Sequence, residues 1–482
     1  MKNTINTINK TCESADYIII GNSAAGLSAA ASIRTIDKTG SIIVLANEQF
    51  ANYSKPLITY YLAGKVKLED MHFKDESFYK ENKILLKFPI NVVKVDFESK
   101  QVISDKGACF RYKKLLLANG GVPIIPKIEI AGSDDFQASK ENKSINNKAA
   151  SKEIVFPKTL DSFSYKNISG IFTFTCIQDA MQIQAHIIKN KTKETAILGG
   201  GLIGLKSAEA FLEIGIKVRV IELSDRILSA TFDKQASSII ENELENKGSK
   251  IYTQNTINKI FVKNGKLDGI ELKNGEKIDS KLLIIAVGVK PDLRILKDSN
   301  AKKEQIISGR GIFTDESMKT SIKDVYAAGD VVESFDFITG NKTNIAIWPL
   351  AVRQGEIAGA NMAGGSKIYG GGYFMNSIEI LNIASISIGI TNPSDDLEGH
   401  VEIIKDFKPE KKTYKKIVML DKKIIGLILV GNIDRAGIYG GLIKNGVDVS
   451  EIKENLIKED FGIIALPSAY KKHLVVGDGI EV

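Results

Sequence analysis

Residues 198–211, LGGGLIGLKSAEAF, decide the fold expected for this chain. They follow the strand-like ETAIL and open an alanine-rich helical pattern, so the glycines lie in a turn between a strand and a helix. Gly199 permits the tight turn, Gly201 lets the backbone approach a pyrophosphate, and Gly204 lets the helix pack close to the sheet. The N–H groups that begin such a helix bind phosphates. The stretch predicts a dinucleotide site in a Rossmann-like unit; glycines that serve an ordinary turn are the alternative.

An acidic residue ends the next predicted strand, KVRVIE, at Glu222. A carboxylate at this place accepts hydrogen bonds from an adenosine ribose and repels a 2′-phosphate, which favours NADH over NADPH. The residues predicted to form this site are Gly199, Gly201, Leu202, Ile203, Gly204 and Glu222.

A second strand–turn–helix–strand plan lies nearer the start, in YIIIGNSAAGLSAAASIRTIDKTGSIIVL, residues 17–45. Serine replaces the middle glycine, but it is small enough to keep close phosphate approach plausible. The strand IIVL is followed by alanine, and the nearest acid, Glu48, comes two residues later. Two such units imply two nucleotide-binding domains on parallel sheets. The residues predicted for the first site are Gly21, Ser23, Ala24, Gly26 and Glu48.

The composition is that of an ordinary globular protein, with 43% hydrophobic and 26% charged residues. No apolar run approaches the roughly 20 residues that span a bilayer, and the polar N-terminus lacks an apolar signal core. We therefore expect a cytoplasmic protein that binds no membrane. The net charge of +7 indicates either a solvated lysine-rich surface or a surface that steers an acidic partner. No arginine-rich block suggests nucleic acid.

The three cysteines, Cys12, Cys109 and Cys176, are widely spaced. Their number and spacing predict neither a disulfide framework nor a metal or iron–sulfur site. We interpret all three as structural or incidental.

Further segments give the chain a family resemblance: LLLANGGVP at 115–123, AVGVKPD at 286–292, VYAAGDVVE at 325–333, and a helical pattern after Trp348. With the two glycine turns and in this order, residues 17–365 resemble the pyridine-nucleotide-disulfide oxidoreductase superfamily of FAD-dependent enzymes. The resemblance implies an α/β chain with glutathione-reductase-like FAD and NAD domains. It places Asn119, Gly120, Gly329, Asp330 and Trp348 at FAD, with Asp330 on the ribityl chain, and Gly288 on the nicotinamide side.

The segment NYSKPLITYYLAGK, residues 52–65, resembles one found in rubredoxin reductases and ferredoxin reductases. Lys55 stands where their arginine meets the FAD diphosphate. The last segment resembles the C-terminal domain of the rubredoxin-reductase group, a partner or subunit surface, so a homodimer is possible. In this α+β domain the KKTYKK stretch is a candidate basic docking patch.

The implied domain bounds follow the same resemblance. They are a disordered lead at 1–15, an FAD domain at 16–132 and 293–367, a low-complexity surface insertion at 133–168, an NAD domain at 169–292, and a C-terminal domain at 368–482.

Lys206 and Tyr60 are candidate catalytic residues. In ferredoxin-reductase relatives the first position is a glutamate that reaches the nicotinamide and pairs with a lysine at the second. A lysine beside the flavin would stabilise its reduced anionic form. The alternative is an i,i+3 surface pair between Lys206 and Glu209.

The resemblance implies an NADH oxidoreductase that uses FAD. No cysteine occurs in ANEQFANYSKPLITYYL, where the superfamily's disulfide reductases carry their relay thiol. Electrons are therefore expected to leave directly to a small redox protein such as rubredoxin or ferredoxin. An NADH oxidase that reduces oxygen and an NADH-sensing interaction module are the alternatives.

Overall fold

The computed structural model describes residues 12–50, 52–132, 159–161, 164–297, 299–300, 306–308, 310–394, 397, 400–467 and 470–471. Within these ranges no helix combines the length and the apolar character that a membrane span requires. The chain divides into two compact units. Unit 1 comprises residues 1–61, 65–122 and 289–372, and unit 2 comprises residues 62–64, 123–288 and 373–482.

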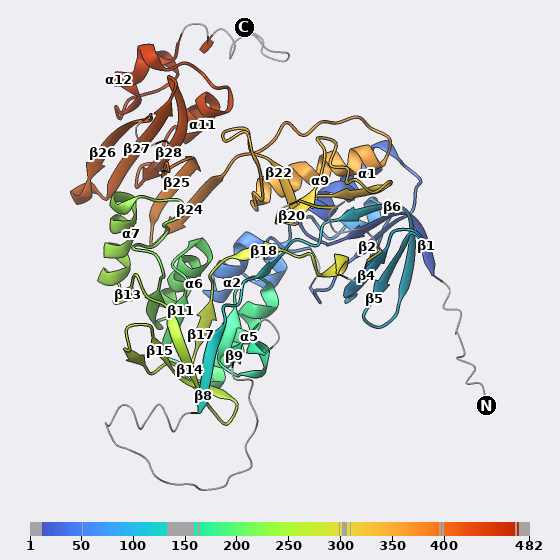
Figure 1. Cartoon of the computed structure of the whole chain (residues 1–482), viewed down its shortest axis with the longest axis horizontal. Helices are drawn as coiled ribbons and strands as arrows, with labels where there is room; N and C mark the ends of the chain where they lie inside the picture. The colour runs from blue at the N-terminus through green and yellow to red at the C-terminus, as the bar shows by residue number, and fades with distance from the viewer. Residues whose placement is uncertain are drawn as a thin grey trace. The chain divides into compact units, whose positions relative to one another are not determined.

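Unit 1 is built on a mixed sheet in the order β3-β2-β1-β6-β5-β4, with β21 also paired to β6 (Figure 1). The long strand β6 pairs with β5 through its first half and with β21 through its second half. The strands are β1 (Glu13–Ile20), β2 (Ile42–Leu45), β3 (Ile84–Lys87), β4 (Val92–Asp96), β5 (Gln101–Ser104), β6 (Cys109–Leu117) and β21 (Val325–Ala327). The pairs β1–β2, β1–β6, β2–β3 and β6–β21 are parallel, so the predicted parallel α/β core is confirmed.

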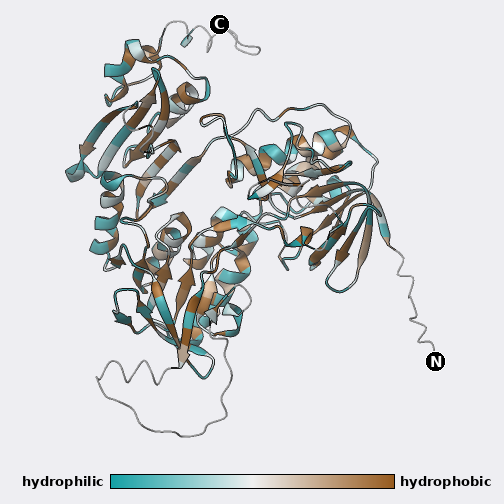
Figure 2. Cartoon of the chain, viewed as in Figure 1, coloured by the Kyte–Doolittle hydropathy of each residue, from teal (hydrophilic) through white to brown (hydrophobic). Residues whose placement is uncertain are grey.

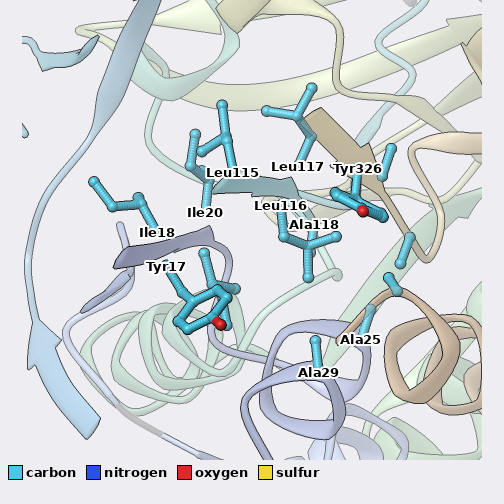
Figure 3. Packing of buried hydrophobic residues seen from close by; sticks show 14 of the residues in the cluster. Tyr17, Ile18, Ile20, Ala25, Ala29, Leu115, Leu116, Leu117, Ala118 and Tyr326 are labelled. Carbon is cyan, nitrogen blue, oxygen red and sulfur yellow. The ribbon is translucent and has the colours of Figure 1, made fainter. Parts of the chain in front are cut away.

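Apolar side chains of the central strands form the core of unit 1. Ile18, Ile19, Leu115 and Leu116 are fully buried, and Figure 3 shows side chains of β1, β6 and β21 gathered next to Ala25 and Ala29. Such uninterrupted apolar runs are typical of parallel strands covered on both faces. Figure 2 shows hydrophobic residues in many of the strands.

Two helices of unit 1, α1 (Ala24–Ile36) and α9 (Trp348–Met362), pack against each other at very close range. A Cβ atom added at Gly355 would lie 2.1 Å from the Ala25 carbonyl oxygen, and one at Gly359 would lie 2.2 Å from the Ala29 carbonyl oxygen. Only glycines on α9 allow this approach. Unit 1 also contains α2 (Ile58–Leu62) except for its last residue, α3 (Phe78–Glu81), and a small sheet of β19 (Ile307–Ser308), β20 (Gly311–Phe313), β22 (Val332–Phe335) and β23 (Lys342–Thr343).

The N-terminal part of unit 2 contains a parallel sheet in the order β10-β17-β11-β12-β13. Its strands are β10 (Ile171–Thr173), β11 (Glu194–Leu198), β12 (Lys217–Ile221), β13 (Lys250–Tyr252) and β17 (Leu283–Ile285). The helices are α5 (Ile177–Asn190), α6 (Leu202–Glu213) and α7 (Lys234–Asn246). A second sheet joins β8 (Ile128–Gly132), β9 (Thr159–Leu160), β14 (Ile257–Lys263), β15 (Lys266–Leu272) and β16 (Lys277–Ile278).

The C-terminal part of unit 2 is an antiparallel sheet in the order β24-β25-β28-β27-β26. The elements are β24 (Met375–Ile380), β25 (Ile383–Gly389), β26 (Glu402–Lys408), β27 (Thr413–Leu420), β28 (Lys423–Val430), α11 (Ala436–Lys444) and α12 (Lys453–Leu456). A sheet with helices is the α+β architecture predicted for this segment. We call it the C-terminal domain.

The compact units depart from the expected domain bounds at several places. Residues 128–132 form β8, which pairs with β14 of unit 2 because its residues continue that sheet. The lead is shorter than expected, since β1 begins at Glu13, and residues 1–11 lie outside the described residues. Of the expected insertion, residues 133–158 and 162–163 also lie outside them, while residues 159–160 form β9. The NAD and C-terminal domains belong to one unit.

A disulfide joins Cys12 and Cys109, which the cysteine spacing does not predict. The bond spans 97 positions of sequence, but β1 and β6 are parallel neighbours in which Glu13 is paired with Phe110. The residues just before these partners therefore lie side by side. Cys176 is not disulfide-bonded and precedes α5.

Candidate functional site

The glycine turn of unit 2 has the geometry expected of a dinucleotide turn. Gly199 has a φ of +111°, and a Cβ atom there would lie 2.4 Å from the Ala286 carbonyl oxygen. A Cβ atom at Gly204 would lie 2.0 Å from the Gly199 carbonyl oxygen, so neither position accepts a side chain. Helix α6 begins at Leu202, one residue before Ile203. The turn thus directs the helix back across the end of its own strand.

The N-terminus of α6 offers its N–H groups to a ligand. Its N-cap is Gly201, which makes no side-chain cap, and the first turn carries no acidic residue. Nothing lies within 4 Å of a Cβ atom built at Gly201. The N–H groups of the first turn and the positive end of the helix dipole suit a pyrophosphate.

Glu222 lies directly beside this turn, at the residue after β12. Its Oε2 accepts a hydrogen bond from the Gly200 amide at 2.6 Å, and its Oε1 accepts one from the Ser224 amide at 2.7 Å. The structure thus brings Glu222 together with the predicted glycines. Gly288, which follows β17 in the chain, has a carbonyl that accepts from the Ile124 amide at 3.0 Å.

The first and third glycines of the turn in unit 1 have the same geometry as those in unit 2. Gly21 has a φ of +120°, and a Cβ atom there would lie 2.1 Å from the Ala118 carbonyl oxygen. A Cβ atom at Gly26 would lie 1.9 Å from the Gly21 carbonyl oxygen. Ser23 is the N-cap of α1, which starts at Ala24, and it makes no side-chain cap. The N-terminus of α1 therefore also presents unsatisfied N–H groups.

Two buried amide groups near this turn have unused hydrogen-bonding atoms. Asn22 Oδ1 accepts from the Tyr79 hydroxyl at 2.9 Å, and Asn119 Nδ2 donates to the Asp292 carbonyl at 2.6 Å. Their other atoms, Asn22 Nδ2 and Asn119 Oδ1, are buried and have no partner among the residues that the structure describes. Buried polar atoms of this kind usually have a partner. A bound ligand would supply it.

Glu48, the candidate acid of unit 1, belongs to an ion-paired group. Its carboxylate accepts from the Tyr53 hydroxyl, and its Oε1 lies 3.2 Å from Lys55 Nζ. Burial raises the pKa of the Asp330 carboxyl, while the charge of Lys55 opposes the rise. Glu48, Lys55 and Asp330 are therefore electrostatically linked, whereas Glu222 contacts its own turn.

The remaining predicted residues of unit 1 lie at element ends. Trp348 opens α9 and makes an edge-to-face contact with Phe73 at 5.1 Å between ring centroids. Gly329 donates its amide to Gln354 Oε1 at 2.8 Å, directly before Asp330. Gly120 directly follows Asn119, and Tyr60 lies on α2, where Lys65 Nζ is 5.8 Å from its ring centroid.

The described residues of unit 1 fit an FAD molecule. The open start of α1, the two buried amides with unused atoms, and a partly buried carboxylate at Asp330 are the donor and acceptor types that a dinucleotide requires. No cluster of three or more histidine, cysteine, aspartate or glutamate side chains that could hold a metal occurs in the described part of the chain.

Lys206 pairs with Glu209, as the i,i+3 alternative predicts. Its ammonium group pairs with Glu209 on the same helix and donates to the Glu379 carbonyl at 2.9 Å. The pair is not on an open surface, since the two side chains are only 17% and 10% exposed. Glu209 also accepts the Leu381 amide at 2.7 Å. Lys206 and Glu209 thus bind the turn between β24 and β25.

Three of the four lysines of the candidate docking patch KKTYKK make contacts within the chain. Lys412 pairs with Glu243 at 2.5 Å and Lys416 pairs with Asp233 at 3.1 Å, both acids lying on or beside α7. Lys415 donates to the Ile457 and Lys458 carbonyls. Strand alternation sends neighbouring lysines to opposite faces, and both faces of β27 are covered.

Asp233 is the centre of the contact between α7 and β27. It caps α7 by accepting from the Ala236 amide, and its Oδ2 accepts from the Tyr414 hydroxyl at 2.6 Å. Burial by itself would raise the pKa of Asp233, but these hydrogen bonds and Lys416 lower it. The carboxylate therefore stays ionised and holds two elements together.

Comparison with known proteins adds two family matches. The model for pyridine nucleotide-disulphide oxidoreductases matches residues 15–355, and the model for the rubredoxin NAD+ reductase C-terminal domain matches residues 375–447.

Among curated proteins, the epsilon subunit of NADH-dependent phenylglyoxylate dehydrogenase from Aromatoleum evansii is 27% identical over 95% of this chain and 98% of its own length. A nitrite reductase from Bacillus subtilis is 28% identical over 90% of this chain, but the chain spans about half of that protein, 48%. The solved NADH:rubredoxin oxidoreductase from Clostridium acetobutylicum has a TM-score of 0.67 at 25% identity, and the match covers 93% of this chain and 98% of that one.

Proposed function

The chain belongs to the pyridine nucleotide-disulphide oxidoreductase family, and from this premise we propose that it passes electrons from NADH through FAD to a small redox protein. Family membership makes it an NADH oxidoreductase with FAD and NADH as its cofactors. The C-terminal match to a rubredoxin reductase domain supports an acceptor of the rubredoxin or ferredoxin kind.

The observation that carries this proposal is the position of the cysteines. No cysteine occurs in residues 46–62, the segment that includes Glu48 and Lys55. The Cys12–Cys109 disulfide lies at the start of β1, whereas the glycine turn follows its end. At about 3.3 Å per residue, an eight-residue strand separates the two by roughly 26 Å. This separation supports a route for the electrons that does not pass through the disulfide.

When bound, FAD supplies the hydride acceptor and passes the electrons on. The chain's own residues bind and orient the two nucleotides. The start of α1, Asp330 and Lys55 would hold FAD, and the start of α6 with Glu222 would hold NADH. A fixed geometry lowers the barrier by removing the entropic cost of bringing the reacting groups together.

The test is a comparison of acceptors with the purified flavoprotein. We expect anaerobic NADH to bleach the flavin and steady-state turnover to be much faster with rubredoxin or ferredoxin than with oxygen. Oxygen as the best acceptor would instead identify an NADH oxidase. Slow turnover with every acceptor and a long-lived NADH–flavin complex would indicate an NADH-sensing module.

A variant without cysteines completes this test. With Cys12, Cys109 and Cys176 all changed to serine, NADH–acceptor activity should persist. Flavin reduction that continues while acceptor reduction stops would reveal a thiol relay and contradict the proposal. The melting temperature of the variant shows whether a loss of activity instead reflects lower stability without the disulfide.

A cytoplasmic location belongs to the proposal as well. Disulfides are rare in cytosolic proteins of mesophiles, so the Cys12–Cys109 bond makes this point testable. Alkylation of thiols in freshly lysed cells should trap both cysteines as thiols if the protein resides in a reducing cytoplasm.

A further inference from the structure

The loop between β12 and α7, residues 222–233, forms the side of the NADH site that carries Glu222. Ser224 donates its amide to Glu222 Oε1 at 2.7 Å, and the Ser229 hydroxyl donates to Ser224 Oγ at 3.0 Å. The Leu228 amide donates to the Gly200 carbonyl at 2.8 Å. A short chain of hydrogen bonds therefore runs from the acid to the middle of the β12–α7 loop and back to the glycine turn.

The same loop contains a residue in an unfavourable backbone conformation. Leu228 has a φ of +53° and is 2% exposed. A leucine in the left-handed region costs free energy, and such a conformation persists only where surrounding contacts impose it. Part of this support comes from the loop itself, since the Thr231 and Phe232 amides both donate to the Leu228 carbonyl at 2.8 Å.

The C-terminal domain supplies further support through one side chain. Asn392 Nδ2 donates to the Ser229 carbonyl and to the Phe232 carbonyl, each at 3.1 Å. Two carbonyl oxygens at this distance require the nitrogen, rather than the oxygen, of the amide. Asn392 follows β25, and the backbone just before it is fixed because the Ile390 amide donates to the Ile425 carbonyl at 2.9 Å.

Arg226 contacts the same two carbonyls from within the loop. Its Nε donates to the Phe232 carbonyl at 3.0 Å, and its Nη2 donates to the Ser229 carbonyl at 3.4 Å. Asn392 and Arg226 thus hold the loop from two directions. Loss of Asn392 alone would leave part of the loop's support, whereas a negative charge in its place would repel both carbonyls.

We propose that Asn392 is a positioning residue for NADH binding: it fixes the β12–α7 loop and thereby places Glu222 for the adenosine ribose. The C-terminal domain is then part of the NADH site in addition to any role in partner binding. The inference rests on the proposed function of Glu222 as the ribose contact.

The experiment measures NADH and NADPH kinetics with ferricyanide as the acceptor, so that protein-partner docking plays no part. Asn392→Asp should raise KM for NADH about tenfold with kcat nearly unchanged, and Asn392→Ala about threefold, the scale of one or two lost hydrogen bonds. Both variants should lower the ratio of kcat/KM for NADH to kcat/KM for NADPH. Flavin content and melting temperature confirm that each variant folds.

Lys412→Ala is the matched control. It removes a contact of the C-terminal domain with α7, the pair with Glu243, without touching the β12–α7 loop. KM for NADH should stay at the wild-type value. An equal rise of KM in Lys412→Ala and Asn392→Ala would mean a general loosening of the domain contact and would overturn the proposal.

A double variant separates this inference from the role of Glu222. If Asn392 acts through Glu222, the effects of Glu222→Ala and Asn392→Asp on the NADH:NADPH ratio should not add. Additive effects, or an unchanged ratio in Asn392→Asp alongside a changed ratio in Glu222→Ala, overturn the positioning role. An unchanged ratio in Glu222→Ala removes the proposed ribose contact itself, and this inference with it.

Discussion

The two glycine turns of the molecule share their outer positions and differ in what surrounds them. Gly21 and Gly199 both have left-handed φ angles, +120° and +111°, and both face a carbonyl of the neighbouring strand's end. The middle position is serine in unit 1 and glycine in unit 2. The outer glycines are thus required by backbone contacts inside the protein. The middle position of unit 2 is not, since nothing lies within 4 Å of a Cβ atom built at Gly201.

The acids that follow the turns differ more. Glu222 accepts from the amide of Gly200 in its own turn. Glu48 instead accepts from Tyr53 and pairs with Lys55. The carboxylate of unit 2 is therefore fixed by the backbone of its site, and that of unit 1 by side chains of a later segment.

The largest effects are expected at the third glycine of each turn. Gly26→Ala and Gly204→Ala each place a methyl group about 2 Å from a carbonyl oxygen of the same turn, at 1.9 Å and 2.0 Å, so the helix must shift. Gly26→Ala should yield protein without flavin. Gly204→Ala should keep FAD but lose reduction by NADH.

Gly201→Ala is the control for this pair, because nothing lies within 4 Å of its added Cβ atom. Its melting temperature should match that of the wild type. If Gly204→Ala retains normal NADH kinetics, the turn of unit 2 does not bind the nucleotide.

The next largest effect is expected at Asp330, which has no counterpart among the residues predicted for the site of unit 2. Asp330→Ala should weaken FAD binding roughly 10- to 100-fold, the range expected when hydrogen bonds to a charged group are lost. Equilibrium dialysis of the flavin measures it. Full flavin retention through extensive dialysis would show that Asp330 does not contact the ribityl chain.

Asp330 also predicts a pH dependence in the flavin-free protein. Burial raises the pKa of its carboxyl above the ordinary 3.8. A raised carboxyl pKa contributes stability below 3.8 that is lost as the pH rises through the folded-state value. The free energy of unfolding should therefore decline as the pH rises from 3.8 to the raised pKa of Asp330 in the folded state. Urea titrations measure this decline, and Asp330→Asn should remove the part that Asp330 contributes.

A smaller effect distinguishes the two acids. Glu222→Ala should reduce the NADH:NADPH ratio of kcat/KM by about tenfold, since a 2′-phosphate is no longer repelled. Glu48→Ala should leave this ratio unchanged and instead weaken FAD binding. An equal change of the ratio in both variants would contradict the assignment of Glu222 to the NADH site and Glu48 to the FAD site.

The smallest effect on flavin reduction by NADH is expected at Lys206, two residues after the third glycine of unit 2. Because Lys206 binds Glu209 and the Glu379 carbonyl, Lys206→Met should leave the rate of flavin reduction by NADH unchanged. It should lower the stability by a few kcal/mol, because Glu209 is left buried without its charge partner. Stopped-flow reduction and thermal melts measure the two quantities. Slower hydride transfer at unchanged stability would restore the flavin-site interpretation.

The sequence predicts the parts of this molecule that depend on local pattern. Strand, turn and helix around Gly21 and Gly199 follow from glycine spacing and apolar runs, and the acid at Glu222 follows from its place after a strand. These features involve residues close together in the chain, where backbone geometry leaves few choices.

The unpredicted parts depend on contacts between distant residues. Asn392 and the β12–α7 loop lie more than 150 positions apart, as do Asp233 and Tyr414, and the Cys12–Cys109 bond follows from the pairing of β1 with β6. Asn22 and Tyr53 lie inside segments that the sequence singles out, but only the fold shows which atoms they contact. The contact of Lys206 with the Glu379 carbonyl also joins distant residues, because Glu379 belongs to the C-terminal domain.

The pairing of β21 with β6 affects how the chain can mature during its synthesis. Residues 325–327 complete a sheet whose other strands end by residue 117, and α9 packs on α1 only after residue 362 has been made. Domains usually fold as units while the ribosome delivers the chain. The nucleotide sheet around β11 and β17 can therefore form first, whereas unit 1 waits for about 200 further residues with its apolar strands uncovered. A chain that ended before residue 325 would contain the glycine turn and Glu222 of the second nucleotide site, but it would lack Asn392 and also β21 and α9, which complete unit 1.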